Sequence, residues 1–263
     1  KEEFKFFNSM VNEKSSFLPP DNVQFEPVEK IANRTSPTNI GLYLASLVSA
    51  VDLNILTIPQ CVDLIEKAFD SIEKMEHFDG HLFNWYDLST LNVIGERFIS
   101  TVDSGNYIAS LVVSNALAEW KKECGICGKT IERVEREIRG ANFKSLFDWT
   151  ENLFFVGIFP EDRKRYGSHY DLYMSESRIT SFLSISLGQI PPSHWHTTER
   201  PVLSFSGRVG IGSWTGTCFE YFMPTLFMPV IENSLEDESL DFAFYCQKKY
   251  VSKNACGTVY GAS

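Results

Sequence analysis

The sequence predicts a mainly α-helical fold in which inner, apolar helices alternate with outer, amphipathic helices. Apolar residues recur at helical spacing through most of the chain, which favours helices over strands. The nearly all-apolar stretch 35–53 is followed by 60–78, which has one charged face, and this alternation indicates a helix hairpin. The composition agrees: 43% of the 263 residues are hydrophobic and 14% are aromatic, enough for a sizeable core.

The first 34 residues are expected to form an extended lead-in, and the domain is expected to span 35–263, truncated at its C-terminus. Three prolines interrupt regular structure in the lead-in: Pro19, Pro20 and Pro27. Thr35 or Ser36 is expected to cap the first helix. Pro37 would lie in its first turn, where a missing N–H costs nothing.

The second predicted helix, 60–78, has two distinct faces. One face carries apolar residues at helical spacing and is expected to be buried: Val62, Ile65, Phe69, Ile72 and Met75. The other face is expected to be solvated because it is charged: Glu66, Lys67, Asp70, Glu73 and Lys74.

The rest of the chain is expected to alternate helices with short β segments. Irregular or short-stranded structure is expected at 79–100, a β-hairpin within 142–170 and a short β segment at 202–214. Further helices are expected at 101–120, 129–140, 170–188, 217–231 and 235–250, with a loop at 190–200.

The charge and the cysteines argue against several classes of function. A net charge of −10 and a pI near 5.1 disfavour a nucleic-acid partner, which needs a basic surface. No apolar run reaches the ~18 residues that can span a bilayer. The six cysteines do not have the spacing of a secreted disulfide framework, which favours a reducing compartment. Cys124 and Cys127 form a CxxC pair without a second pair nearby, so neither zinc nor any other cofactor is expected.

Two glutamates lie in apolar surroundings. Glu176 shares the face of the predicted 170–188 helix with four apolar residues: Leu172, Ile179, Leu183 and Leu187. Glu220 lies among aromatic residues in "CFEYFMP". A buried carboxylate needs compensating partners. A structural ion pair with Arg178 or Arg200 would supply them, whereas two catalytic carboxylates would flank an oxocarbenium-like transition state in glycoside chemistry.

Aromatic residues with polar tips are candidates for sugar binding. His81, Trp85 and Tyr86 could form a platform for a sugar ring, or a core aromatic cluster. Trp195, in the "HWH" of residues 194–196, could form a second rim. No third ligand accompanies these histidines, so no metal site is expected.

Three further polar residues have two interpretations each. Asp103 and Asp171 lie at the starts of predicted helices, where each could cap the helix or bind a sugar hydroxyl. Asn106 follows Gly105, and glycine allows close approach of a ligand. All three are candidates for substrate binding.

Six motifs occur in a fixed order along the chain: "LPPDN", "RTSPTNIGLYLAS", "GHLFNWYDLSTL", "RFISTVDSGN", "YDLYMSESRITSFLSISLGQIPPSHW" and "SWTGTCFEYFMPTLFMP". Together they resemble the glucoamylase-like domain in the middle of cyclic β-1,2-glucan synthases, from Phe17 onward. The resemblance implies an (α/α)6 toroid, complete or incomplete, with its active site at one end. It also implies a β-1,2-glucan substrate and retaining transglycosylation, which cyclises the linear polymer.

The resemblance also implies roles for residues in these motifs. Glu176 of "SESR" matches the glutamate of the family's "SEAR" and is the predicted nucleophile, and Glu220 of "FEY" is the predicted acid/base. Arg178, Trp214 and Tyr221 lie in the same motifs and are candidates for substrate binding.

Two segments depart from the family pattern. "HWH" stands where the family has "HWF". "ACGTVYGAS", 255–263, resembles the start of the family's "PWGISES", whose glutamate would follow Ser263. The acid/base is therefore either Glu220 or that acid.

The resemblance further implies a cellular context. In the synthases this domain lies between a membrane-embedded glycosyltransferase region and a phosphorylase-like domain. We therefore expect the chain on the cytoplasmic side, within an inner-membrane multidomain protein, with neighbouring domains or another chain covering its apolar faces. A hydrolase of the endo-β-1,2-glucanase type and a non-catalytic glycan-binding or scaffold module are the alternatives.

Overall fold

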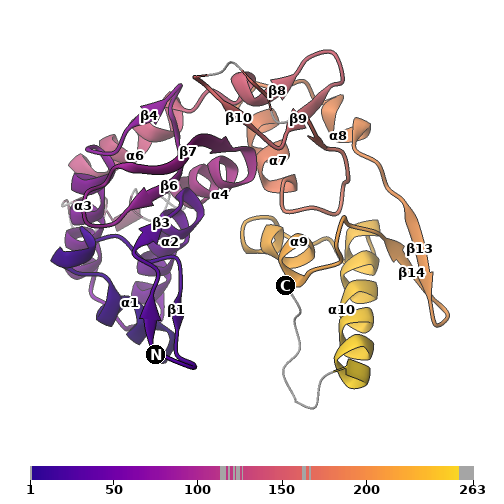
Figure 1. Cartoon of the computed structure of the whole chain (residues 1–263), viewed down its shortest axis with the longest axis horizontal. Helices are drawn as coiled ribbons and strands as arrows, with labels where there is room; N and C mark the ends of the chain where they lie inside the picture. The colour runs from indigo at the N-terminus through magenta and orange to yellow at the C-terminus, as the bar shows by residue number, and fades with distance from the viewer. Residues whose placement is uncertain are drawn as a thin grey trace. The chain divides into compact units, whose positions relative to one another are not determined.

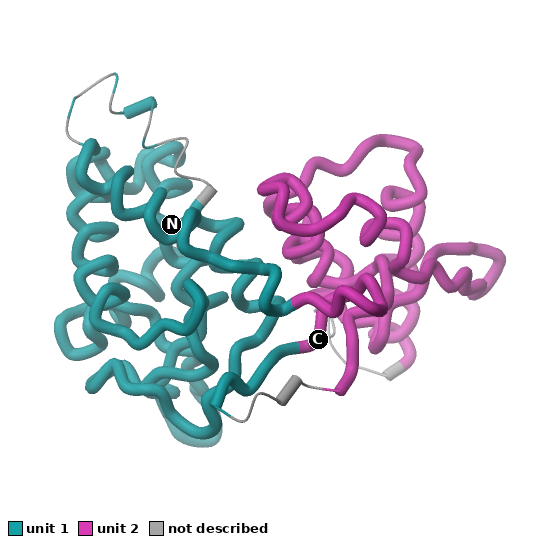
Figure 2. Tube along the Cα trace, turned by 90° about the horizontal axis from the view of Figure 1, so that it is seen from above, with its two compact units in different colours: residues 1–146, 157–166 teal, residues 147–156, 167–263 magenta. Residues whose placement is uncertain are grey.

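A computed structural model of the chain describes residues 2–112, 127–161, 164–165 and 167–254, together with 117, 119, 120, 122 and 125. Helices and short strands alternate along it (Figure 1). The chain forms two compact units: unit 1 is Lys1–Leu146 with Gly157–Tyr166, and unit 2 is Phe147–Val156 with Gly167–Ser263 (Figure 2). The mainly helical class with small β-hairpins agrees with the sequence, and the toroid stays a prediction.

Unit 1 contains most of the longer helices. They are α1 (Glu2–Met10), α2 (Pro37–Asp52), α3 (Ile58–Ile72), α4 (Thr101–Val112) and α6 (Gly128–Gly140), with short 3-10 turns η1 (Glu13–Ser15) and η2 (Phe143–Leu146). The lead-in is therefore not extended throughout, because α1 lies within it. Phe4 is buried and the ring of Phe7 packs 5.1 Å from that of Tyr43 on α2, so these aromatic residues give α1 an apolar face.

The strands of unit 1 are short and antiparallel. One sheet has the order β11-β10-β7-β6-β3, built from β3 (Arg34–Thr35), β6 (Asn84–Asp87), β7 (Val93–Ser100), β10 (Gly157–Phe159) and β11 (Lys164–Arg165). Two further pairs are β1 (Val23–Gln24) with β2 (Lys30–Ile31), and β4 (His77–Phe78) with β5 (His81–Leu82).

The predicted cap and close packing of α2 are both present. The Ser36 hydroxyl accepts a hydrogen bond from the Asn39 N–H at 3.2 Å, and Pro37 opens the helix. Helix α2 packs against α4 at Gly41. A Cβ there would lie 2.8 Å from the Ser110 hydroxyl and 2.9 Å from the Tyr107 Cα, so only glycine permits this approach.

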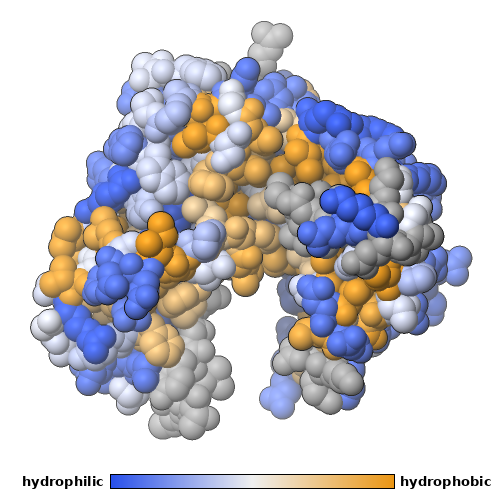
Figure 3. Space-filling view, turned by 180° about the vertical axis from the view of Figure 1, so that it is seen from behind, coloured by the Kyte–Doolittle hydropathy of each residue, from blue (hydrophilic) through white to orange (hydrophobic). Residues whose placement is uncertain are grey.

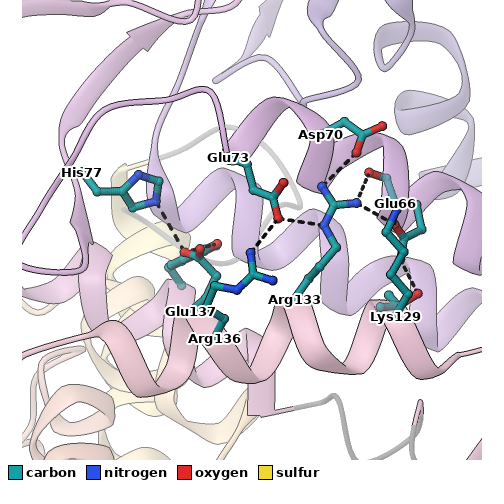
Figure 4. A network of polar contacts seen from close by, with 10 residues as sticks. Glu66, Asp70, Glu73, His77, Lys129, Arg133, Arg136 and Glu137 are labelled. Carbon is teal, nitrogen blue, oxygen red and sulfur yellow. Dashed lines mark hydrogen bonds and ion pairs between the residues drawn. The ribbon is translucent and has the colours of Figure 1, made fainter.

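Helix α3 begins slightly earlier than the predicted 60–78 and ends at Ile72, because His77 and Phe78 form β4, and it is less exposed on its charged face than predicted. Thr57 and Gln60 form a capping box before Ile58. The predicted core face is buried at Ile65, Phe69 and Ile72. The opposite face is not fully solvated, because three of its carboxylates bind Arg133 of α6 (Figure 4): Glu66, Asp70 and Glu73.

In the part of unit 2 that the structure describes, short strands combine with four helices. Strands β8 (Phe147–Asp148), β9 (Leu153–Phe155) and β12 (His169–Tyr170) form an antiparallel sheet in the order β12-β9-β8, and β13 (Val202–Phe205) pairs with β14 (Arg208–Ile211). The helices are α7 (Arg178–Ser186), α8 (His194–Thr197), α9 (Cys218–Phe222), followed by η3 (Met223–Leu226), and α10 (Leu235–Asn254). A core cluster packs Met174 against residues of β14, α9 and α10: Ile211, Tyr221, Leu240 and Ala243.

Two predicted helices of unit 2 are wrong in extent. The 170–188 helix is helical only at Arg178–Ser186, because Tyr170 pairs within the β8–β9–β12 sheet and Leu172 bridges to Glu199. Tertiary strand pairing thus overrides helical spacing there. The 217–231 helix gives way to η3 after Phe222, where Pro224 follows closely.

Hydrophobic side chains reach the surface of unit 2, at the left of the space-filling view (Figure 3). They include residues of the β13–β14 hairpin: Val202 is 70% exposed and Val209 55%. A groove of about 530 Å³ lies between β13 and α10. Among the described residues, no helix is long and apolar enough to cross a membrane.

Candidate functional site

Glu176 lies in the turn that leads into α7 and not within a helix. The Ser175 hydroxyl donates to the Oε2 atom of Glu176 at 3.3 Å, and the backbone carbonyl of Glu176 accepts the Ile179 N–H at 3.2 Å. The residue is half-buried. The predicted apolar stripe is therefore incomplete: Ile179 and Leu183 are buried, whereas Leu187 is 40% exposed.

The two arginines that the sequence offered as partners of Glu176 have other contacts. Arg178 is buried, and its Nη2 lies 3.0 Å from Glu236 Oε1 on α10. Burial lowers the pKa of Arg178, and the Glu236 carboxylate opposes that shift. Arg200 donates to the carbonyls of Trp195 and Thr198. The contact of Arg178 favours a structural role, and its assignment to substrate binding stays a prediction.

Glu220 is held by neutral hydrogen-bond donors at the start of α9. Its carboxylate accepts from the Ser213 hydroxyl at 3.1 Å, from the N–H and hydroxyl of Thr215 at 3.1 and 2.7 Å, and from the Thr217 N–H at 2.9 Å. Thr217 and Glu220 also form a capping box. Burial alone would raise the pKa of Glu220, but hydrogen bonds from Thr215, Thr217 and Ser213 outweigh it and lower the pKa. This geometry suits a structural carboxylate better than a proton donor, and the acid/base assignment stays a prediction.

Asp171 and Trp214, both predicted as substrate contacts, come together in unit 2. The indole N–H of Trp214 donates to Asp171 Oδ1 at 2.8 Å. The indole stacks on the Tyr170 ring, with centroids 5.4 Å apart and planes 18° apart. Trp214 nevertheless remains 46% exposed. Asp171 does not cap a helix, because α7 begins seven residues later, at Arg178.

The predicted platform of His81, Trp85 and Tyr86 is largely internal to unit 1. His81 and Tyr86 are buried, and the Tyr86 hydroxyl accepts from the Phe83 N–H at 2.8 Å. Burial lowers the pKa of His81, which favours its neutral form. Trp85 is half-buried, with the Arg34 guanidinium 4.4 Å from its ring. The geometry favours the alternative, a core aromatic cluster.

Asp103 and Asn106 both lie in α4. Asn106 is fully buried and donates to the Thr38 hydroxyl of α2 at 3.1 Å, so it joins two helices. Asp103 is half-buried in the first helical turn, where its N–H donates to the Ser100 hydroxyl at 3.2 Å. The capping role predicted for Asp103 is wrong, because α4 already begins at Thr101 and the Ser100 hydroxyl accepts the Asp103 N–H. Its assignment to substrate binding stays a prediction, and the contact of Asn106 favours a structural role.

Tyr221 and Trp195, two further candidates for substrate binding, differ in burial. Tyr221 is buried, its hydroxyl donates to the Ile211 carbonyl at 2.8 Å, and it lines the groove between β13 and α10. Trp195 is half-buried and packs edge-on against Tyr173, with centroids 5.3 Å apart. The neighbouring His194 is buried between the Ser181 hydroxyl and the Asn152 carbonyl.

One polar pair in unit 2 was not predicted. His169 Nε2 lies 3.0 Å from Asp148 Oδ2, and the N–H groups of Thr150 and Glu151 donate to Asp148 Oδ1. Burial raises the pKa of Asp148, but these hydrogen bonds outweigh it and lower the pKa. The pair joins two strands far apart in sequence, so spacing alone could not have revealed it.

A comparison with curated proteins aligns 99% of the chain with 14% of the cyclic beta-(1,2)-glucan synthase NdvB of Rhizobium meliloti (strain 1021), at 24% identity over 383 residues. The predicted resemblance to the glucoamylase-like domain of such synthases is confirmed. No protein-family model matches the chain. The aligned region is longer than the 263 residues of this chain, so the synthase has residues there that this chain lacks.

Solved structures share the glucoamylase-like fold. The endo-beta-1,2-glucanase from Chitinophaga pinensis, in complex with sophorotriose and glucose, matches 98% of the chain with a TM-score of 0.79 at 14% identity. The endo-beta-1,2-glucanase from Talaromyces funiculosus, in complex with sophorose, matches 95% with a TM-score of 0.70 at 7% identity. The chain spans 66% and 62% of these two proteins.

The predicted CxxC pair is only partly described by the structure. Cys127 is buried, and Cys124 lies outside the described residues. In the described part of the chain, no group of three histidine, cysteine, aspartate or glutamate side chains could hold a metal ion.

Proposed function

We propose that this chain acts on β-1,2-glucan as a carbohydrate-active domain. The observation that carries the proposal is the alignment of 99% of the chain with a cyclic β-1,2-glucan synthase. The shared fold with two endo-β-1,2-glucanases that bind sophorose-type oligosaccharides supports it further. The proposed reaction is retaining transglycosylation, in which the chain cleaves a linear glucan and closes the retained part into a ring.

Glu176 is the carboxylate that we propose to react with the sugar. Retaining chemistry needs a nucleophile and an acid/base on opposite sides of an oxocarbenium-like transition state. Glu176 lies half-buried in the turn before α7, where its carbonyl accepts the Ile179 N–H, and this contact helps to fix its position. The donors around Glu220 disfavour it as the acid/base, because a carboxylate with a lowered pKa is a poor proton donor.

The test is incubation of the full chain with linear β-1,2-glucan, with β-1,3- and β-1,4-glucans as controls. A cyclic product contains one water fewer than the linear chain of equal length, so mass spectrometry separates ring closure from hydrolysis. Rings support transglycosylation, whereas shortened linear chains support the hydrolase alternative. The absence of either product from β-1,2-glucan would contradict catalysis by this chain.

E176Q removes the proposed reacting carboxylate while keeping its size. We expect turnover to fall about a hundredfold to ten-thousandfold, whereas oligosaccharide binding changes little. E199Q is the matched control, because Glu199 is an exposed glutamate of the same unit. Equal loss in both variants, or none in E176Q, would count against the role of Glu176.

A non-catalytic glycan-binding module is the second candidate. The hydrogen bonds around Glu220 favour it, because they occupy the only other carboxylate proposed for catalysis within this chain. Such a module would bind β-1,2-gluco-oligosaccharides without converting them, and E176Q would affect mainly its stability.

The chain is further proposed to work on the cytoplasmic side of a membrane-bound synthase, with neighbouring domains covering its apolar surface. Its match to 14% of a much longer synthase supports this context. Antibodies against the chain should reach it in inverted membrane vesicles and not in intact spheroplasts. The opposite accessibility would place the domain outside the cytoplasm.

A further inference from the structure

Trp214 is fixed in place although almost half of it is exposed. Its indole N–H is bound to Asp171 at 2.8 Å, and one face of the ring is covered by Tyr170. An exposed tryptophan normally samples several rotamers, and fixing it in the free protein lowers the entropy lost on binding. The Trp214 ring is therefore held in one orientation before any ligand binds, and 46% of the residue is exposed.

The loop that carries Trp214 is anchored on both sides by Glu220. The preceding Ser213 donates its hydroxyl to the Glu220 carboxylate at 3.1 Å, and the following Thr215 donates both its N–H and its hydroxyl. Gly216 continues the turn with φ +79°, and its N–H donates to the Ser213 hydroxyl at 2.9 Å. The carboxylate thus fixes the backbone on either side of the indole.

We propose that Trp214 is a glucose-binding platform, that Asp171 and Tyr170 orient its ring, and that Glu220 is a positioning residue for it. This inference rests on the proposed function, because it names the sugar contact of that function. The apolar C–H face of a glucosyl unit would stack on the indole face opposite Tyr170. Asp171 Oδ1 holds the indole N–H, and no described donor occupies Oδ2, which is available to a sugar hydroxyl.

The inference gives Glu220 a purpose that its apolar surroundings alone did not reveal. Acting as acid/base would require a proton to enter or leave a carboxylate that already accepts several hydrogen bonds. Acting through Ser213 and Thr215 requires only that the charge stay in place. The lowered pKa of Glu220 agrees with the second role.

The first test measures binding of sophorotriose and longer β-1,2-gluco-oligosaccharides by calorimetry. All proteins carry E176Q, so the ligand is not consumed. W214A should weaken binding about tenfold, and W214F should weaken it less because it keeps an aromatic face. W149A is the matched control, since Trp149 is 58% exposed in the same unit. Its affinity should stay within about twofold of the parent.

The second test asks whether Glu220 acts through Trp214. E220Q should weaken sugar binding when Trp214 is present, and should have no further effect when W214A is already present. A general structural role for Glu220 would weaken binding equally in both backgrounds, which would overturn its positioning role. Thermal melting of each variant shows whether it is folded at the temperature of the measurement.

The outcomes separate this inference from the proposed function. Binding of β-1,2-gluco-oligosaccharides that W214A leaves unchanged, or that W149A weakens as much, overturns the platform and leaves the proposed function intact. Binding of β-1,3- or β-1,4-oligosaccharides alone, lost in W214A, supports the platform and overturns the proposed substrate. No binding of any of these sugars overturns both.

Discussion

Arg133 in unit 1 and Glu220 in unit 2 are both buried charges, but their surroundings compensate them differently. The Arg133 side chain is only 4% exposed and lies 2.5 to 2.9 Å from carboxylate oxygens of Glu66, Asp70 and Glu73 (Figure 4). Glu220 is 8% exposed and accepts hydrogen bonds from neutral serine and threonine groups. One charge is neutralised by opposite charges, and the other is solvated by dipoles.

The two charges stabilise different kinds of structure. The carboxylates around Arg133 lie on α3 and the arginine lies on α6, so this cluster joins two helices of unit 1. The donors to Glu220 come from residues 213–217, immediately before its own short helix, so the charge organises one loop. Ion pairs are weakened by added salt, whereas hydrogen bonds from neutral groups respond mainly to protonation of the acceptor.

The largest effect is expected from R133M, which keeps the length of the side chain and removes its charge. Glu66, Asp70 and Glu73 would then lose their shared cation, and the more exposed Lys129 and Arg136 would remain near Glu66 and Glu73. Because these carboxylates are 23%, 62% and 40% exposed, water would solvate them in part. We expect the free energy of unfolding of unit 1 to fall by about 3 kcal/mol, as measured by urea denaturation.

R133K sharpens this prediction. A lysine ammonium is a compact charge and cannot reach three carboxylates with the planar geometry of a guanidinium. It should recover part of the stability lost in R133M, and 1 M NaCl should narrow the difference between R133M and wild type. A wild-type midpoint in R133M would show that the cluster does not stabilise the contact between α3 and α6.

A smaller effect is expected from E220Q, which keeps the shape of the side chain and removes its charge. The amide keeps one acceptor oxygen but places an N–H₂ group among hydroxyl and N–H donors. Loss of these hydrogen bonds should lower the free energy of unfolding by about 1–2 kcal/mol. Added NaCl should leave this difference unchanged, in contrast to R133M.

The difference in stability between wild type and E220Q should depend on pH. The pKa of Glu220 is lower in the folded protein than its ordinary value of 4.5, so its contribution is present above pH 4.5 and is lost as pH falls through the lower folded pKa. The difference in stability between wild type and E220Q should therefore shrink as the pH falls below 4.5. A difference that grows on acidification would contradict a lowered pKa.

The sequence predicted local structure better than tertiary contacts. The Ser36 cap, Pro37 in the first turn and the buried face of α3 follow from neighbouring residues, and each is present. The start of α7 was wrong because Leu172 pairs with the distant Glu199. Helical spacing cannot detect such pairing.

The same distinction applies to the candidate site. The sequence marked both Asp171 and Trp214, which lie far apart in the chain, and the fold joins them. It also marked Glu220 as an unusual acid, but the donors that explain this acid became visible only in three dimensions. Tyr170, whose ring fixes that of Trp214, carried no distinguishing pattern of its own.

The smallest effect is expected from R136M, the matched control for R133M. Arg136 also lies on α6 and contacts the same Glu73 at 3.3 Å, but its side chain is 67% exposed. An exposed ion pair contributes little because water already solvates both charges, so the free energy of unfolding should change by less than about 1 kcal/mol. If R136M destabilises unit 1 as much as R133M in the same urea titration, the burial of Arg133 is not what distinguishes the two arginines. Arg133 and Glu220 would then differ only in that the partners of Arg133 are charged and those of Glu220 are neutral.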